Sequence, residues 1–149
     1  MVFELVKYLG KWYEVARVDN SFEPNMRNVT AEYNLKLDGN IEVINSAFIF
    51  SDYKRIIGTA KTTDDEYLLK VSFFNDEYSD YRILFVDEDY QYAVVGGNKE
   101  NYMWILSRTP HIDDDKLNEL LEIAKEKGYN VEEIIKTIHT DDEIIYVKW

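Results

Sequence analysis

The residues Gly10-Lys11-Trp12-Tyr13-Glu14-Val15-Ala16-Arg17 form the stretch that decides the fold. They form the start of a strand, with a bulky indole just behind a glycine. Gly10 can adopt backbone angles that are closed to other residues, and it lets neighbouring backbone approach closely. The stretch therefore predicts a tight turn into a strand that places a large flat ring in the core, where aromatic side chains usually lie.

A second stretch lies far downstream and completes the pattern: Tyr102-Met103-Trp104-Ile105-Leu106-Ser107-Arg108-Thr109-Pro110. Further motifs accompany the two stretches, namely Phe3, Tyr8-Leu9-Gly10, Phe22-Glu23, Tyr33, Val43-Ile44-Asn45, Val71-Ser72-Phe73-Phe74 and Tyr92-Ala93-Val94-Val95-Gly96. In order and spacing, this set resembles the lipocalin family, in particular its bacterial members of the outer-membrane lipoprotein type and their relative apolipoprotein D. The resemblance extends from about residue 3 to about residue 139.

The resemblance implies a structural signature at the closed end of a barrel. In lipocalins the Gly-x-Trp of the first strand and an arginine of the last barrel strand meet there, with the guanidinium lying over the indole. Gly10, Trp12 and Arg108 stand at the matching positions. We therefore expect Arg108 to cover the ring of Trp12 in this chain.

The composition limits the organisation and the partners of the chain. A chain of 149 residues is expected to form one domain, residues 1–149, that buries roughly 70% of its unfolded surface. The 17 Lys and Arg residues against 29 Asp and Glu residues leave a formal charge of −12. A charge of this sign repels the phosphates of nucleic acids and anionic membrane surfaces, so we expect no nucleic-acid partner.

The chain contains no cysteine, which removes disulfides, thiolate nucleophiles and Cys-based metal sites. It has no apolar run near the length of about 18 residues that a membrane helix needs, so we expect no transmembrane segment. Residues 1–7 hold neither the apolar core nor the cleavage site of a signal peptide. Bacterial lipocalins of the type it resembles carry a lipoprotein signal with an acylated cysteine. The expectation is therefore a trimmed mature form or a cytoplasmic member, with the compartment unknown.

Hydrophobic alternation with a period of two predicts strands. Such segments recur with turns roughly every 8 to 12 residues, at 10–17, 28–37, 41–50, 55–63, 67–74, 81–86, 91–95 and 102–108. This pattern is typical of an all-β sandwich or barrel. Small residues at the inward-facing positions favour the barrel, because a filled sandwich would need larger side chains there. We predict an eight-stranded antiparallel up-and-down β-barrel, the lipocalin fold, whose closure removes exposed sheet edges.

The hydrophobic period changes after the eighth strand. Asp113 is typical of a helix N-cap, apolar residues at helical spacing follow it, and Gly128 is typical of a helix end. The pattern predicts one C-terminal α-helix packed outside the barrel and a short ninth strand over residues 134–139. The tail over residues 143–149 has no counterpart in the family pattern.

Turn-forming residues at 19–25 predict a long loop after the first strand. In lipocalins this connection folds over the open mouth, which would make Phe22 and Met26 its apolar tips. An ordinary surface loop is the alternative.

The sequence contains no catalytic or metal-binding pattern. His111 and His139 neighbour no serine elbow and are interpreted as surface or edge residues, and two scattered histidines do not make a zinc site. The acidic runs at 64–66, 87–89 and 113–115 lack the glycine and the final Glu of a calcium loop, so we interpret them as solvated turns. We expect no enzyme activity, no metal and no cofactor.

The remaining candidate is an internal cavity. Strand parity places Tyr33, Asn45, Phe73 and Trp104 on inward files, and these positions match pocket-lining sites of the relatives. Ala31, Ala47, Gly58 and Ala60 would leave space for a ligand. Tyr102 is expected at the rim, and Arg55 is the foremost of three candidate cations at the mouth, the others being Lys54 and Arg27. Glu14 shares the parity of Trp12, and Arg55 or Lys61 would pair with it if it is buried.

The resemblance implies a carrier of a small hydrophobic ligand, most plausibly a fatty acid or a lysophospholipid, since the bacterial relatives bind such lipids. Two alternatives stay open, namely a lipocalin-like enzyme that acts on a lipophilic substrate and a binder of haem or porphyrin. A homodimer is also left open.

Overall fold

A computed structural model describes residues 2–18, 26–99 and 102–140 of the chain. The elements follow in the order α1 (Leu5–Tyr8), β1 (Gly10–Val18), β2 (Met26–Leu35), β3 (Ile41–Ile49), β4 (Asp52–Thr62), β5 (Leu68–Ser72), β6 (Ser79–Val86), β7 (Tyr92–Gly96), β8 (Met103–Ser107), α2 (Asp114–Glu126) and β9 (Ile135–Lys136). This order confirms the predicted eight barrel strands, the C-terminal helix and the extra strand.

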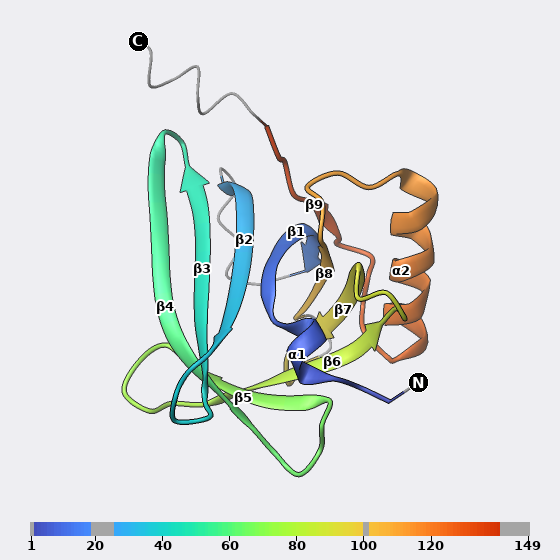
Figure 1. Cartoon of the computed structure of the whole chain (residues 1–149). Helices are drawn as coiled ribbons and strands as arrows, with labels where there is room; N and C mark the ends of the chain where they lie inside the picture. Colours follow the sequence, from blue (N-terminus) through green and yellow to red (C-terminus); the bar gives the residue numbers. More distant parts are fainter. Residues whose placement is uncertain (1, 19–25, 100–101, 141–149) are drawn as a thin grey trace.

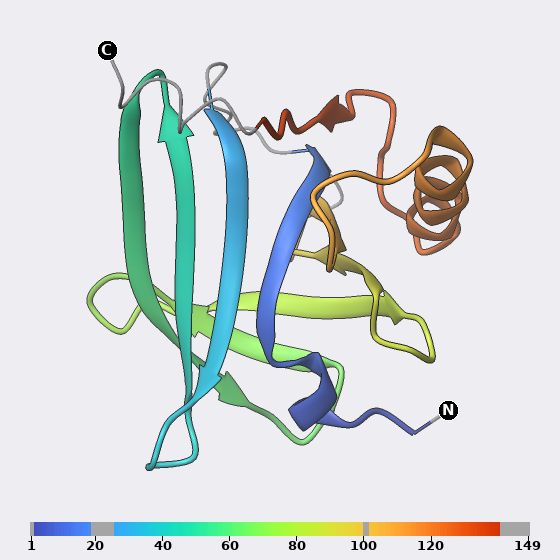
Figure 2. The ribbon, with the colours of Figure 1, turned by 45° about the horizontal axis from the view of Figure 1, so that its top comes forward.

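Strands β1 to β8 close into a ring. From β2 to β8 each strand pairs antiparallel with the next, and β1 pairs with both β8 and β2. In Figures 1 and 2, β2, β3 and β4 stand side by side as a tall wall, while β5 and β6 cross below them. β9 lies outside the ring, against β1. Closure satisfies the backbone groups that an open sheet would leave at its edges.

One end of the barrel is filled by α1, an element that the sequence did not predict. The ring of Tyr8 lies 5.2 Å from that of Trp12, and Phe3 packs 5.1 Å from Tyr67. All of these side chains belong to one apolar cluster that extends into the barrel. We call this the closed end and the opposite one, where β1 ends and β2 begins, the open end.

The C-terminal helix forms as predicted. The Asp113 carboxylate accepts a hydrogen bond of 2.7 Å from the Lys116 amide, and Gly128 follows the helix at φ +93°. Leu117, Leu120 and Ala124 are buried, and they pack with residues of β7 and β8 on the outer surface of the barrel. None of the described helices is long and apolar enough to cross a membrane.

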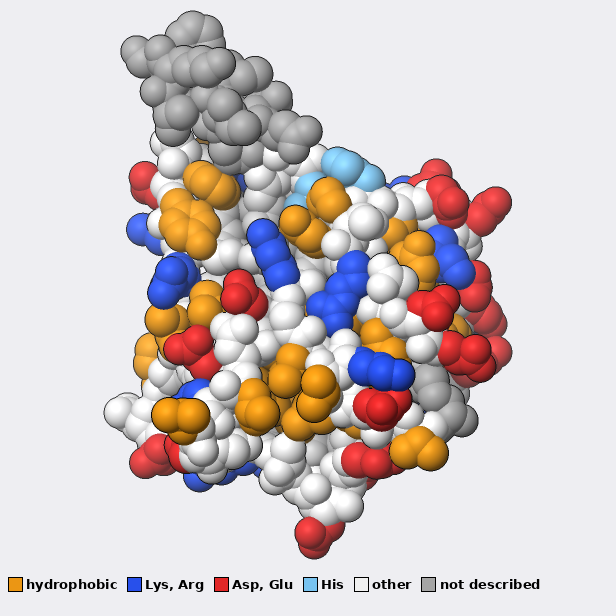
Figure 3. Space-filling view, viewed as in Figure 1, with side chains coloured by type: hydrophobic (Ala, Val, Ile, Leu, Met, Phe, Trp, Pro, Cys, Tyr) orange, Lys and Arg blue, Asp and Glu red, His pale blue; other side chains and the backbone are white. Residues whose placement is uncertain are grey.

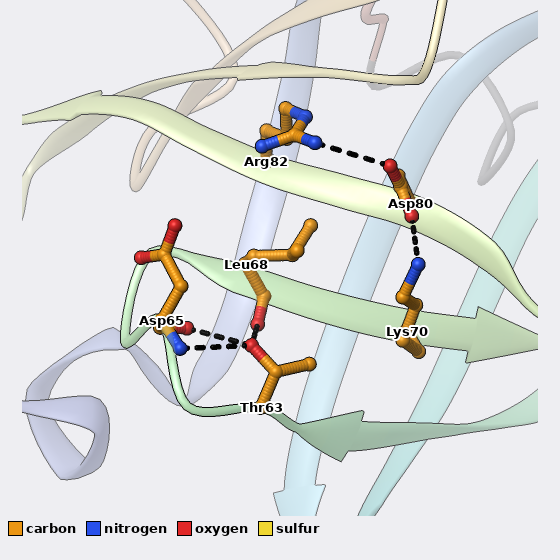
Figure 4. A network of polar contacts seen from close by, with 6 residues as sticks. All are labelled: Thr63, Asp65, Leu68, Lys70, Asp80 and Arg82. Atoms are coloured by element: carbon orange, nitrogen blue, oxygen red, sulfur yellow. Dashed lines mark hydrogen bonds and ion pairs between the residues drawn. The ribbon is translucent and has the colours of Figure 1, made fainter.

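Polar contacts fix the turn between β4 and β5 and the pairing of β5 with β6 (Figure 4). The Thr63 hydroxyl donates to the carbonyl of Leu68 at 2.8 Å. On the neighbouring strands the Asp80 carboxylate binds Lys70 and, at 3.3 Å, Arg82. The hydrogen bond from Lys70 lowers the pKa of Asp80 below its usual value.

The ninth strand is shorter than predicted. Within the described part of the chain, residues 135 and 136 are the two that form a ladder with β1. The next two residues form hydrogen bonds with two different strands. The Thr137 amide donates to the Val15 carbonyl of β1, and the Ile138 carbonyl accepts from the Asn28 amide of β2. A segment shared between two partners cannot continue one ladder, which is why the strand ends early. The predicted 19–25 loop with Phe22, and the 143–149 tail, lie outside the described residues.

Candidate functional site

A cavity of about 660 Å³ occupies the barrel and extends toward the open end. Every strand of the ring contributes to its wall, and most of that wall is apolar. The volume lies within the range of about 300–1,000 Å³ that small-molecule sites occupy. The cavity is therefore large enough for one lipid-sized ligand.

The register of β2, β3 and β4 explains which side chains face inward. Asn45 lies opposite Ala31 on β2 and opposite Ile56 on β4, and all three line the cavity. Of the four small residues expected to leave space, Ala31 and Ala47 line the cavity, whereas Gly58 and Ala60 are not among its described lining residues. At Gly58 the prediction was wrong, because a Cβ there would lie 2.6 Å from the Phe73 ring. The space at Gly58 is thus taken by a neighbouring side chain.

The structure brings most of the predicted site residues together. Tyr33, Asn45, Phe73 and Trp104 all line the cavity, and Arg55 borders it near the open end. Tyr102 is different, because it packs beside Gly97 in the hairpin between β7 and β8 and is not one of the described lining residues.

Three tyrosines join their hydroxyl groups deep in the barrel. The Tyr81 hydroxyl lies 2.8 Å from that of Tyr33 and 2.5 Å from that of Tyr8. Burial raises the pKa of Tyr33 to about 12 and raises the pKa values of Tyr8 and Tyr81 well above 10. All three therefore stay neutral at physiological pH. Sequence reasoning missed the roles of Tyr8 and Tyr81, although Tyr81 shares the parity of the buried Ile83.

A buried ion pair lies in the cavity wall on β1. The Glu14 carboxylate accepts a hydrogen bond of 2.8 Å from Arg17, and the two residues are 6% and 1% exposed. A bulge between Glu14 and Ala16 places Glu14 opposite Leu106 and Arg17 opposite Trp104. Both charged side chains therefore face the interior, although they are three residues apart. The predicted partners of Glu14, Arg55 and Lys61, are wrong, because the strand supplies Arg17 itself.

The same carboxylate anchors the C-terminal segment. The Thr137 hydroxyl donates to Glu14 at 2.6 Å, and His139 Nε2 donates to the Glu14 carbonyl at 2.6 Å. Asn28 exchanges two hydrogen bonds with the backbone of Thr140. His139 is thus a buried anchor of this segment rather than the surface or edge residue that the sequence suggested.

Two cations border the mouth without side-chain partners among the described residues. Lys54 lies opposite Ala47 and shares the inward parity of Ile56, whereas Arg55 lies opposite Ser46 on the alternate face. Arg27, the third candidate, lies 5.2 Å from the Phe48 ring on the outside of the wall. The Asn45 amide faces the cavity and makes no hydrogen bond to a described residue.

The acidic turns are used in local structure. The Asp87 carboxylate accepts hydrogen bonds from the amides of Gln91 and Tyr92, and Asp113 caps α2. In the described ranges, no three His, Asp or Glu side chains gather closely enough to hold a metal ion.

Known proteins are similar to this chain in sequence. A family described as "Lipocalin-like domain" matches residues 3–139. The chain is 43% identical to outer membrane lipoprotein Blc of Vibrio cholerae, over 89% of this chain and 81% of the relative. It is 39% identical to the Escherichia coli K12 protein of the same name, over 89% and 77%, and 30% identical to apolipoprotein D of Mus musculus, over 91% and 76%.

Solved structures share the fold at low sequence identity. Insecticyanin from Manduca sexta superposes with a TM-score of 0.75 at 16% identity, covering 95% of this chain and 83% of the other. Lobster apocrustacyanin A1 gives a TM-score of 0.73 at 17% identity, covering 92% and 80%. At these identities the likeness concerns the barrel architecture alone.

Proposed function

Because the chain belongs to the lipocalin family, which binds small hydrophobic ligands, we propose that it carries a fatty acid or a lysophospholipid in its barrel cavity without catalysing a reaction on it. One observation supports this choice of ligand: the cavity wall is mostly apolar, and near the mouth it includes Lys54 and Arg55, which have no side-chain partner among the described residues, together with one acid, Glu77. Such a distribution matches a single-chain amphiphile with an anionic head.

The apolar depth favours a long acyl chain. Trp104, Leu106 and Phe73 line the wall, and each methylene transferred from water to such a wall contributes about 0.8 kcal/mol. Affinity is therefore expected to rise about fourfold per added methylene until the chain fills the cavity.

The mouth favours a head group with an anionic oxygen. The net charge of −12 opposes an anionic ligand, and local cations are needed to offset that field. Lys54 faces inward from β4, and Arg55 follows it at the rim. Both groups are available to a carboxylate or a phosphate that stays near solvent while the acyl chain lies below it.

Displacement of a fluorescent fatty acid from delipidated protein tests the proposal. Saturated fatty acids of increasing length and a lysophospholipid serve as competitors. Ala47→Phe places a ring inside the cavity and should abolish binding. Ile44→Phe adds the same ring on the outer face of the same strand and should leave binding unchanged. Absence of saturable binding, or equal loss in both variants, would refute the proposal.

Mass spectrometry of the bound lysophospholipid separates a carrier from an enzyme. A carrier returns the lipid intact after prolonged incubation. Release of the free fatty acid in proportion to time and protein concentration would instead establish a hydrolase, and the non-enzymatic part of the proposal would be withdrawn.

A further inference from the structure

Acidic side chains gather at the closed end of the barrel. The three turns that connect strands there, residues 36–40, 63–67 and 87–91, hold seven Asp or Glu residues and one basic residue, Lys36. Two of these turns contact the N-terminal segment, since Phe3 packs on both Tyr67 and Tyr90. Seven of the 29 acidic residues of the chain therefore lie in the turns of this end, against one basic residue.

The open end of the β2–β4 wall has the opposite character. Arg27, Phe48, Phe50, Tyr53, Arg55 and Ile57 lie together there on the outer face, and we call this group the mouth patch. Figure 3 shows hydrophobic and basic side chains side by side on the upper left, over β4. Residues 26–27 and 48–57 contain three Lys or Arg residues and one acidic residue, Asp52.

Contacts within the mouth patch leave two of its three aromatic rings, those of Phe50 and Tyr53, facing solvent. The Phe48 ring lies 5.3 Å from that of Tyr53, with the Arg27 guanidinium 5.2 Å from Phe48 on the neighbouring strand. Phe50 is nevertheless 66% exposed and Tyr53 55% exposed. Aromatic rings and arginines with apolar bodies and polar tips are suited to the boundary between lipid and water.

Phe50 also adopts a backbone conformation that does not suit it. Its φ is +57°, a region where Asn and Gly are favoured and bulky residues are rare. An exposed ring in this conformation contributes little to the stability of the hairpin. Its place at the tip of the β3–β4 connection is better explained by contact with a partner.

We propose that the mouth patch docks the barrel on the surface of an anionic lipid bilayer, with the cavity mouth toward the lipid and the acidic closed end away from it. The net charge of −12 suggested repulsion from such a surface, but its distribution changes that conclusion. A strand of the length of β3 spans about 30 Å. The acids of the closed end therefore lie beyond the Debye length of about 10 Å from the membrane, whereas the cations of the patch lie within it together with a single acid, Asp52.

On the premise of the carrier function proposed above, a docked barrel would take up its lipid directly from the bilayer. Docking can nevertheless be tested independently. Phe50, Tyr53 and Arg27 lie outside the cavity lining, so replacing them changes docking without changing the ligand site. If ligand binding failed while vesicle binding held, the carrier proposal would fall and the docking surface would stand.

Sedimentation with vesicles tests the docking surface. The intact chain should bind vesicles of equal parts phosphatidylcholine and phosphatidylglycerol, bind vesicles of phosphatidylcholine alone much more weakly, and be released as salt is raised. Phe50→Asn should lower the partition coefficient by about tenfold, while the protein stays at least as stable because Asn tolerates the positive φ. Tyr53→Ser provides a second variant that does not depend on that backbone strain.

Matched variants at the closed end serve as controls. Leu37 is fully exposed there, and Leu37→Ser should leave vesicle binding unchanged. Arg27→Gln should weaken binding by about fivefold, whereas Lys36→Gln should not. Equal effects at both ends, equal binding to both kinds of vesicle, or no binding at all would overturn the proposal. Light scattering that shows a dimer dissociated by Phe50→Asn, without vesicle binding, would also overturn it and assign the patch to a second copy of the chain.

Discussion

The guanidinium carbon of Arg108 lies 3.7 Å from the centroid of the Trp12 ring. The same guanidinium donates hydrogen bonds of 2.9 Å to the carbonyls of Lys7 and Lys11 and, through Nε, one of 3.0 Å to the carbonyl of Tyr90. A single side chain therefore joins α1, the start of β1 and the turn before β7. The predicted contact between Arg108 and the Trp12 ring is confirmed. Arg108 also holds the segments of the closed end together through its hydrogen bonds.

A double-mutant cycle measures the interaction energy between Trp12 and Arg108. Trp12→Ala should lower the free energy of unfolding by about 3–5 kcal/mol, as deletion of a large buried aromatic does. Arg108→Ala should cost about 2–4 kcal/mol, because charged hydrogen bonds are lost together with the cation–π contact. Urea denaturation of both variants and of the double variant should give a coupling of about 1–2 kcal/mol. Strictly additive losses would show that the two side chains do not act on each other.

The elements that the sequence predicted correctly are those in which a hydrophobic pattern repeats over many residues or in which a capping residue marks the end. Alternation along residues 28–37, and the helical spacing that follows the N-cap at Asp113, each extend over many residues. One residue that departs from such a pattern does not obscure the strand or the helix. The parts that sequence reasoning missed depend on single-residue events. The bulge in β1 reverses parity between Glu14 and Arg17, and a helix of four residues, α1, is too short to show a period. The contact between Gly58 and Phe73 depends on how two strands pack together, and no pattern along the sequence predicts it.

The ion pair of β1 provides a second test. Arg17→Met should destabilise the fold by about 3–5 kcal/mol, because it leaves the Glu14 carboxylate buried without its cation. Glu14→Gln combined with Arg17→Met should recover much of that loss, since neither buried charge then remains. Denaturant unfolding of the single and double variants checks this expectation.

The exposed pair of Lys116 and Glu119 on α2 serves as the control for that test. Its oxygen–nitrogen distance is 3.1 Å, but solvent screens it, so Lys116→Met should change stability far less than Arg17→Met. If Arg17→Met were as mild as Lys116→Met, the buried pair would not hold the wall of the cavity together.

The tyrosine network predicts a loss of stability in alkali. Because burial raises the pKa of Tyr33 from 10 to about 12, the unfolded chain releases the proton first. The stability linked to Tyr33 is therefore fully present below pH 10 and declines as pH rises toward 12, by roughly 3 kcal/mol in all. Tyr33→Phe should flatten this decline, while Tyr53→Phe, which removes an exposed hydroxyl, should not. Denaturant midpoints measured across this pH range decide it, and ionisation of all 12 tyrosines near pH 10 in the folded state would contradict it.

On the premise of the carrier proposal, the cations at the mouth should select a ligand with an anionic head group. A fatty acid should bind more tightly than the alcohol of the same chain length, because only the acid brings a negative charge to Lys54 and Arg55. Lys54→Gln should remove most of that preference, up to about fivefold, and Arg55→Gln less, because Lys54 shares the inward parity. Asn45→Ala should weaken acid and alcohol alike, since its amide can bond either head group. Competitive titration of both ligands into each variant, with Lys36→Gln as the control at the closed end, measures these differences. Equal affinities for acid and alcohol in the unaltered protein would mean that the cavity recognises the acyl chain alone.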